Sequence, residues 1–244
     1  PGGIGNPSAC RDADVVVVTA STLPASASAS HDAERRKARK EAKVSAILHD
    51  AYPIRYWDHD LGPDQPRLLV GRQLGTADAP LDLLDLTPQP GRRFDDAEIS
   101  ISHDGRTVLT TAARGEQGGI RATLVAIDVA SRDERTLLAE DRAEFSGATI
   151  SPDGERAVVV RVTDGDPTTP PTFHVLLLDL RDGTTVELAP EWDRWPGGFE
   201  WLPDGTAVLC VADDEGAAPV FRIDVADGAV TRLTTDHGAY SDLQ

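Results

Sequence analysis

The sequence predicts an all-β fold, an incomplete β-propeller of four-stranded antiparallel blades with one helical insertion near residues 31–48. Three observations predict this fold. A tight-turn phrase occurs three times at nearly regular spacing, apolar runs follow it, and a second turn phrase recurs in the same register. Strand-rich repeats of about 40 to 50 residues are typical of propeller blades.

The first turn phrase is centred on Asp104, Asp153 and Asp204, which lie 49 and 51 residues apart. Two copies read SPDG and LPDG, and His103 replaces the proline in the other copy. Because proline fixes one backbone angle and glycine tolerates positive φ, each copy predicts a tight turn between two strands of a hairpin.

The residues after these turns are apolar at consecutive positions, as in 157–160 and 207–211. A strand with one wet face would alternate between apolar and polar residues instead. Continuous apolar runs predict strands buried on both faces, as in sheets stacked against neighbours on either side. The runs at 124–129 and 175–180 have the same character.

The second turn phrase is a hydrophobic-Asp-hydrophobic triplet centred on Asp128, Asp179 and Asp224. It predicts the end of a third strand, a turn, and a fourth strand such as TTVEL or AVTRL. We interpret the three aspartates as caps of these turns rather than as ligands. Four antiparallel strands in each unit make a propeller blade.

This pattern divides the chain into an irregular blade with the insertion, residues 1–98, and repeat units at 99–148, 149–199 and 200–244. Residues 240–244 align with 145–149, where an innermost strand is expected, so we expect the chain to be a fragment of a longer polypeptide. Within the irregular blade, strands are predicted at 15–19, 52–57, 67–74 and 81–86.

The insertion is predicted to be one helix over residues 31–48. Ser30 can cap it, Asp32 and Glu34 occupy the first turn, and strong helix formers follow. Segment 34–43 holds six basic and two acidic residues, the reverse of the overall balance. We interpret it as a solvated helix, while docking on an acidic partner surface and binding of an anion stay open.

The chain has 24 basic and 41 acidic residues and a net charge of −17, which disfavours nucleic acid as a partner. Its longest aliphatic runs have four residues, far short of the roughly 20 that span a bilayer, so no membrane partner is expected. Cys10 and Cys210 match no metal-ligand or CxxC spacing. We interpret them as unpaired thiols, with a disulfide left open.

Two segments carry candidate ligand-binding side chains. Trp192, Arg194 and Trp195 precede an expected innermost strand, and the planar fork of the arginine suits a peptide carboxylate. The alternative is a packing corner with the arginine stacked on tryptophan.

The second segment is Asp58-His59-Asp60, which offers three metal-ligand side chains. In a strand the aspartates would face away from the histidine, so a turn before Gly62 is favoured over a metal site. The sequence predicts no catalytic residue, no cofactor site and no metal site.

The SPDG-type blades, the basic insertion and the phrase PIRYWDHDLGPDQPRLLVG at 53–71 together resemble the N-terminal propeller of bacterial prolyl oligopeptidase family serine peptidases. The similarity is greatest to the acylaminoacyl-peptidase and dipeptidyl-aminopeptidase branch. The resemblance implies a propeller that caps a C-terminal α/β-hydrolase domain carrying a Gly-x-Ser-x-Gly elbow. No such motif occurs here, so we expect a catalytically inactive chain whose parent protein is a serine peptidase.

The resemblance also implies a role as a filter that admits short or acylated peptides. The expected partners are the hydrolase domain and short peptide substrates, in the cytoplasm, with a homo-oligomer left open. The insertion offers only isolated Glu34 and Glu41 where dipeptidyl-peptidase relatives hold the substrate ammonium with paired glutamates, so an acylaminoacyl or general oligopeptidase is favoured.

Two other functions remain alternatives. A TolB-like propeller shares the SPDG blades and would act only as a protein-interaction module. A metal-dependent lactonase-type propeller would need ligands converging from several blades, and the sequence gives no clear set.

Overall fold

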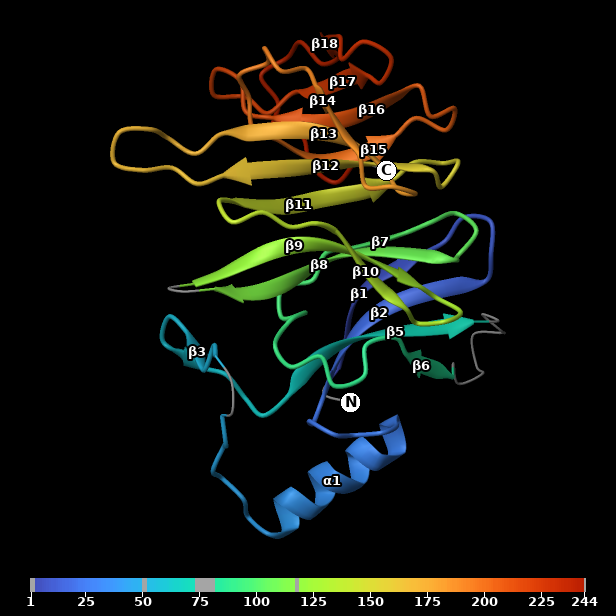
Figure 1. Ribbon diagram of the computed structural model, residues 1–244, viewed down its shortest axis with the longest axis vertical. Coiled ribbons are helices and arrows are strands. Elements are labelled where there is room, and N and C mark those ends of the chain that lie inside the picture. The colour runs from blue at the N-terminus through green and yellow to red at the C-terminus, as the bar shows by residue number, and fades with distance from the viewer. Residues whose placement is uncertain (1–2, 50–51, 73–81, 117–118, 244) are drawn as a thin grey trace.

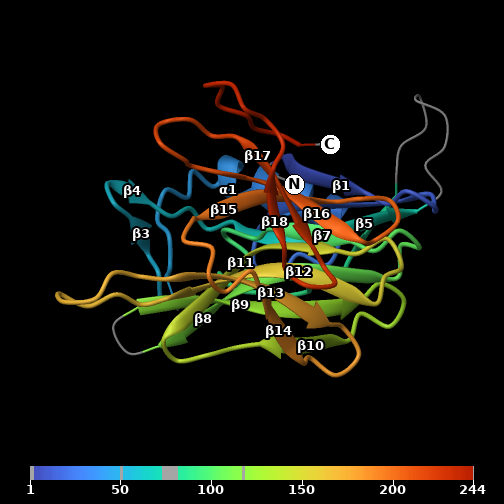
Figure 2. The same cartoon turned by 90° about the horizontal axis from the view of Figure 1, so that it is seen from above.

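The computed structural model describes residues 3–49, 52–72, 82–116 and 119–243. In this part of the chain, four antiparallel sheets of four strands each stack along the long axis of the molecule (Figure 1). Seen from above, the strands of successive sheets lie over one another (Figure 2). The predicted all-β fold and partial propeller of four-stranded blades are confirmed.

Each sheet is a meander in which the strands pair in chain order. The first sheet contains β1 (Ile4–Ala9), β2 (Val15–Thr22), β5 (Gln65–Arg72) and β6 (Leu83–Asp85). The second contains β7 (Ile99–Ile101), β8 (Thr107–Glu116), β9 (Gly119–Asp128) and β10 (Glu134–Leu138).

The third sheet contains β11 (Ala143–Ile150), β12 (Arg156–Thr163), β13 (Phe173–Asp179) and β14 (Thr185–Leu188). The fourth contains β15 (Pro196–Trp201), β16 (Ala207–Ala212), β17 (Val220–Asp224) and β18 (Val230–Arg232).

The SPDG-type phrases form the turns between the first and second strands of the last three sheets. In each turn the aspartate Oδ1 accepts a hydrogen bond of 3.0 Å from the backbone N–H two residues later. The following glycine has a φ of +71°, +74° or +67°, a region that side chains rarely adopt. The predicted hairpin turns are therefore present, with His103 at the proline position in one of them.

The aspartates of the second turn phrase divide into two kinds. Asp128 Oδ1 accepts from the N–H groups of Ala130 and Ser131, and Asp179 Oδ1 accepts from that of Arg181. These two are the predicted caps. Asp224 differs, because its carboxylate accepts only from the guanidinium of Arg222, at 2.5 Å, and from no backbone N–H among the described residues.

Three apolar layers hold the stack together, one between each pair of adjacent sheets. The run at 157–160 is buried throughout. Val158 and Val160 belong to the layer with the fourth sheet, whereas Ala157 and Val159 belong to the layer with the second. Both faces of this strand are therefore covered, as its continuous apolar character predicts.

The insertion departs from the prediction in two places. Helix α1 spans Ala29–Glu41 and is capped by Ser28, so residues 42–48 of the predicted helix are not helical. Lys43 has a φ of +51°, which ends the helix. The predicted strand at 52–57 is reduced to β3 (Arg55–Tyr56), because Trp57 at φ +51° turns the chain into β4 (His59–Asp60).

Other differences lie at the two ends of the chain. Strand β1 was not predicted from PGGIGNPSAC, yet it pairs with β2. Residues 240–243 form no strand, although they align with an innermost strand. Tyr240 instead donates its hydroxyl to Asp236 and its backbone N–H to the carbonyl of Ala218. Residues 73, 74, 81 and 244 of the predictions lie outside the described residues.

No helix in the described ranges is both long enough and apolar enough to span a membrane.

Candidate functional site

The first strands of the four sheets, β1, β7, β11 and β15, meet around one cavity of about 520 Å³. Neighbouring first strands are in contact along the series from β1 to β15. In a propeller the innermost strands surround the central channel, so this cavity occupies the position of the channel. We call it the channel cavity.

Polar side chains connect the inner strands across the wall of the channel cavity. Glu98 accepts a hydrogen bond of 2.5 Å from the N–H of Gly147, and Ser100 accepts one of 3.0 Å from that of Ile150. The indole N–H of Trp201 donates to the carbonyl of Thr149 at 3.0 Å. An innermost strand has one edge without a backbone partner, and these side chains satisfy that edge of β11.

Side chains of both charges line the channel cavity, namely Arg11, Glu98 and Glu200, together with the imidazole of His103. His103 lies 3.9 Å from the carboxylate of Asp12. The channel cavity therefore offers both positive and negative groups to a ligand. The sequence analysis did not select these residues as candidates.

The structure contains a hydroxyl-imidazole-carboxylate chain outside the channel cavity. The hydroxyl of Thr172 lies 2.8 Å from Nε2 of His174, whose Nδ1 lies 2.7 Å from Glu187. The hydroxyl of Thr172 also lies 2.5 Å from that of Thr163. The hydroxyl of Thr172 is therefore shared between Thr163 and His174, and His174 and Glu187 lie on β13 and β14. We interpret these side chains as a cross-strand polar cluster.

The predicted substrate-contact residues point to three different neighbours. Trp192 packs edge-on against Phe221 with ring centres 5.0 Å apart, and Trp195 stacks on Phe173 at 4.3 Å. Two guanidinium nitrogens of Arg194 contact Asp214 Oδ1 at 2.7 and 3.0 Å. None of the three is among the described residues that line the channel cavity.

The contact between Arg194 and Asp214 raises the pKa of this guanidinium. Asp214 also contacts Arg232 at 2.8 Å, so the carboxylate is shared by two arginines. A peptide carboxylate would have to compete with Asp214 for the fork of Arg194. The role of Trp192, Arg194 and Trp195 in substrate contact stays a prediction.

The Asp58-His59-Asp60 segment forms part of a surface hairpin. Trp57 and Asp58 make the turn, and His59 and Asp60 form β4. Nδ1 of His59 lies 2.5 Å from Asp58 Oδ1, and both side chains are exposed. Among the described residues no group of three or more His, Cys, Asp or Glu side chains has the arrangement of a metal site.

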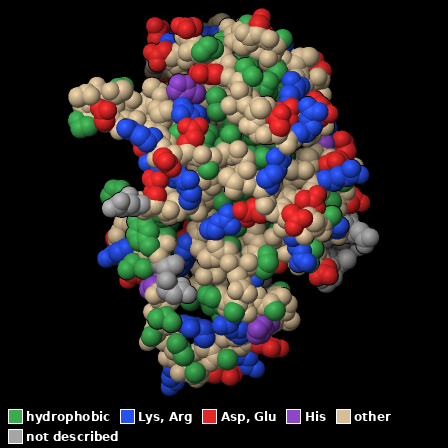
Figure 3. Space-filling view, viewed as in Figure 1, with side chains coloured by type: hydrophobic (Ala, Val, Ile, Leu, Met, Phe, Trp, Pro, Cys, Tyr) green, Lys and Arg blue, Asp and Glu red, His purple; other side chains and the backbone are tan. Residues whose placement is uncertain are grey.

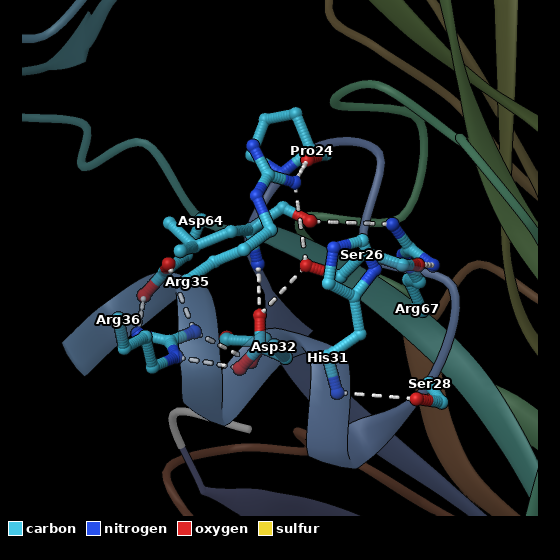
Figure 4. Close-up of polar contacts among 11 residues, drawn as sticks. Pro24, Ser26, Ser28, His31, Asp32, Arg35, Arg36, Asp64 and Arg67 are labelled. Carbon is cyan, nitrogen blue, oxygen red and sulfur yellow. Dashed lines mark hydrogen bonds and ion pairs between the residues drawn. The ribbon is translucent and has the colours of Figure 1, made fainter. Parts of the chain in front are cut away.

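A buried aspartate anchors the basic helix to the first sheet (Figure 4). The side chain of Asp32 is fully buried and accepts hydrogen bonds from the N–H of Leu23 at 2.6 Å and from Arg36 at 2.6 Å. Burial alone would raise the pKa of this carboxyl, but the bonds to Arg36 and Leu23 lower it overall. Arg36 also contacts Asp64 at 3.0 Å, which joins the helix to the residue just before β5.

The segment after α1 carries an unusual share of exposed apolar side chains. Figure 3 shows hydrophobic side chains over the lower left of the molecule, next to the basic side chains of the helix. Half of the large exposed hydrophobic residues in the described chain lie here: Val44, Ile47, Leu48, Tyr52, Ile54 and Trp57. The insertion therefore presents both basic and apolar surface.

Cys10 and Cys210 are both free thiols, as expected. Cys210 is buried in the layer between the third and fourth sheets, and desolvation raises its pKa to about 12. The thiol of Cys10 donates to the carbonyl of Val15 at 2.9 Å. Both side chains behave as packing residues.

No family model and no curated protein matches the chain. Among solved structures, TolB from Acinetobacter baumannii aligns at 15% identity and a TM-score of 0.54, covering 96% of this chain and 44% of that chain. A Mycobacterium tuberculosis puromycin-hydrolyzing peptidase aligns at 12% identity and 0.56, covering 95% and 29%. Pyrococcus horikoshii acylaminoacyl peptidase aligns at 11% and 0.51, covering 95% and 32%.

The chain therefore spans less than half the length of each of these structures. At such low identity the similarity concerns the fold, which is that of a β-propeller module. The resemblance to the propellers of prolyl oligopeptidase family peptidases is confirmed at this level, and TolB shares the same fold.

Proposed function

We propose that the chain is the non-catalytic propeller portion of a prolyl oligopeptidase family serine peptidase, where it limits access to short or acylated peptides. The observation that carries this proposal is the cavity of about 520 Å³ at the channel position. A cavity of this size is within the range of small-ligand sites and would exclude a folded protein. Its lining of both charges is compatible with peptide groups.

The insertion favours a peptidase propeller over a plain interaction module. It lies between the second and third strands of the first sheet and is tied to that sheet through Asp32, Arg36 and Asp64. Its basic and apolar surface would suit an α/β-hydrolase domain of the same protein as partner. Association of a second copy through the same surface is an alternative within this proposal.

The purified chain is expected to hydrolyse neither alanyl nor acetylalanyl p-nitroanilide, because it lacks a Gly-x-Ser-x-Gly elbow. The measurement is release of p-nitroaniline at protein concentrations high enough to detect a few turnovers an hour. Release that a serine-directed phosphonate blocks would contradict the proposed non-catalytic role.

The coding sequence downstream of residue 244 separates the two candidate functions. A reading frame that continues into an α/β-hydrolase domain with the serine elbow supports the peptidase. A reading frame that ends after further blades alone supports the TolB-like interaction module. At the level of the fold, the alignment to TolB supports this module as much as the alignments to peptidases support the peptidase.

Arg194 is proposed to hold the carboxylate of a bound peptide. If it does, Arg194→Gln will reduce the preference for a free C-terminal carboxylate over an amide by about tenfold, since the bidentate contact is lost. Asp214→Asn will strengthen binding because the competing charge is removed. Calorimetric titration with an acetylated tetrapeptide and its amide measures both effects.

Arg181→Gln is the matched control for this experiment, because Arg181 is also paired with an aspartate but is highly exposed. An unchanged preference in Arg194→Gln would remove Arg194 from the substrate-contact residues and leave it as a packing residue at the corner before β15.

A further inference from the structure

A second cavity, of about 340 Å³, lies beside the channel cavity and shares only Glu98 with it. We call it the acidic cavity. Tyr56 of the insertion, the segment before β7 and the beginning of β11 surround it. Four of its lining residues are acidic: Asp95, Asp96, Glu98 and Glu144.

The positive charges near the acidic cavity are largely engaged elsewhere. Arg93, which also lines the cavity, is held by both oxygens of Glu134, at 2.5 and 3.1 Å. Within the described chain, Asp96 and Glu144 form no ion pair. Among the described residues, the carboxylates of Asp96 and Glu144 therefore have no paired positive charge, and Asp95 has only Arg92.

Asp95 is the most informative of these residues. Its side chain is 8% exposed, and its only ion pair among the described residues is a long contact of 3.5 Å between Oδ2 and Arg92. Oδ1 is buried and has no hydrogen-bond partner among the described residues. Burial, together with the charge of Asp96, raises the pKa of this carboxyl despite the nearby Arg92. A buried carboxylate with no donor at one oxygen is costly in its charged form, and positive charge bound nearby in the cavity would offset that cost.

The remaining walls of the acidic cavity suit an aliphatic chain. Ala113, Ile120 and Ala122 are partly exposed there, whereas Ala112 and Phe145 are buried. Tyr56 is half-buried, and its pKa is raised by burial and by the charges of Asp95 and Asp96. An aromatic ring beside carboxylates is a favourable environment for ammonium and guanidinium groups. Long basic side chains combine an apolar stem with a charged end in the same way.

We propose that the acidic cavity binds a cationic group carried on an aliphatic chain, such as the side chain of a lysine or arginine residue in a peptide, or a free alkyl diamine. The exposed carboxylates of Asp96 and Glu144 contact the charged end, and the buried charge of Asp95 attracts it. Tyr56 covers this end, and the apolar wall contacts the stem. An organic cation fits better than a metal ion, since the described carboxylates do not form a metal-ligand group. The inference does not depend on the proposed peptidase.

Calorimetric titration of the purified chain tests this inference. The probes are an acetylated, amidated tripeptide with a central lysine, its arginine and norleucine counterparts, and 1,5-diaminopentane. We expect the lysine and arginine peptides to bind and the norleucine peptide not to bind. The double substitution Asp96→Asn, Glu144→Gln is expected to weaken lysine-peptide binding by about tenfold or more, because two exposed charges that face the ligand are removed.

The matched control is Asp133→Asn, Glu155→Gln, which removes the same charge from exposed positions outside the acidic cavity. It should leave affinity unchanged. Binding of the diamine without the peptides would assign the site to free amines and still support the cation site. Equal binding of the norleucine peptide, no binding by any cation, or an unchanged affinity in the acidic-cavity variant would overturn the inference.

Discussion

Asp32→Ala is expected to destabilise the insertion by about 3 kcal/mol, because it leaves buried donors without their charged acceptor. The Asp32 side chain is fully buried, and it accepts from the N–H of Leu23, the hydroxyl of Ser26 and the guanidinium of Arg36. Hydrogen exchange of α1 amides measures the loss as a free energy of local opening. Limited proteolysis after residue 28 should become faster in parallel.

Glu34→Ala is the control, because Glu34 lies in the same helix but is exposed. It removes one favourable charge near the helix N-terminus and should cost no more than about 0.5 kcal/mol. Equal effects of the two substitutions would mean that charge near the helix terminus, and not the buried contacts, holds the insertion.

The contribution of Asp32 also has a predicted pH dependence. Its pKa is lower in the folded protein than in the unfolded chain, where it is about 3.9. The stabilisation by Asp32 is therefore complete above the unfolded-state pKa, and it is lost as the pH falls through the folded-state pKa. Local opening of α1 should be independent of pH near neutrality and should increase only in strong acid.

Leu109→Ala is expected to lower the free energy of unfolding by about 2 to 5 kcal/mol, since it leaves a cavity between the second and third sheets. Leu109 is 0% exposed and belongs to the apolar layer that also contains Phe145 and Leu178. Urea unfolding followed by circular dichroism measures the change.

Leu233→Ala removes the same atoms from a side chain that is 48% exposed, and it should change the stability by about 0.5 kcal/mol or less. A small effect for Leu109→Ala would contradict the stacked arrangement, because that arrangement requires the face of β8 carrying Leu109 to be covered.

The repeating part of the fold could be predicted from the sequence because its signals are local. The Asp-Gly turns set the hairpins, and continuous apolar runs such as 157–160 show that both faces of the strand are covered. Both properties are contained in short stretches of sequence. The turns between the first and second strands of the last three sheets accordingly lie at the predicted Asp-Gly positions.

The irregular first blade was harder to predict. Strand β1 has little apolar character and forms because β2 offers it a free edge. The helix ends at Lys43 and the hairpin turns at Trp57, both non-glycine residues with positive φ. Such conformations are uncommon for these residue types, so composition gives no warning of them.

The candidate sites depend on contacts between sheets, which a repeat pattern does not reveal. Glu98 and Ser100 contact backbone groups of β11, about 50 residues away in sequence. The acidic cavity joins Tyr56, Asp95 and Glu144 from three separate segments. Conversely, Trp192, Arg194 and Trp195 are adjacent in sequence but contact different neighbours.

A crystal structure of the chain tests the central claim most directly. We predict four antiparallel four-stranded sheets in a stack, with β1, β7, β11 and β15 around the channel cavity and the indole N–H of Trp201 within hydrogen-bond distance of the Thr149 carbonyl. Parallel strands joined by crossover helices, or inner strands that do not surround a common cavity, would contradict it.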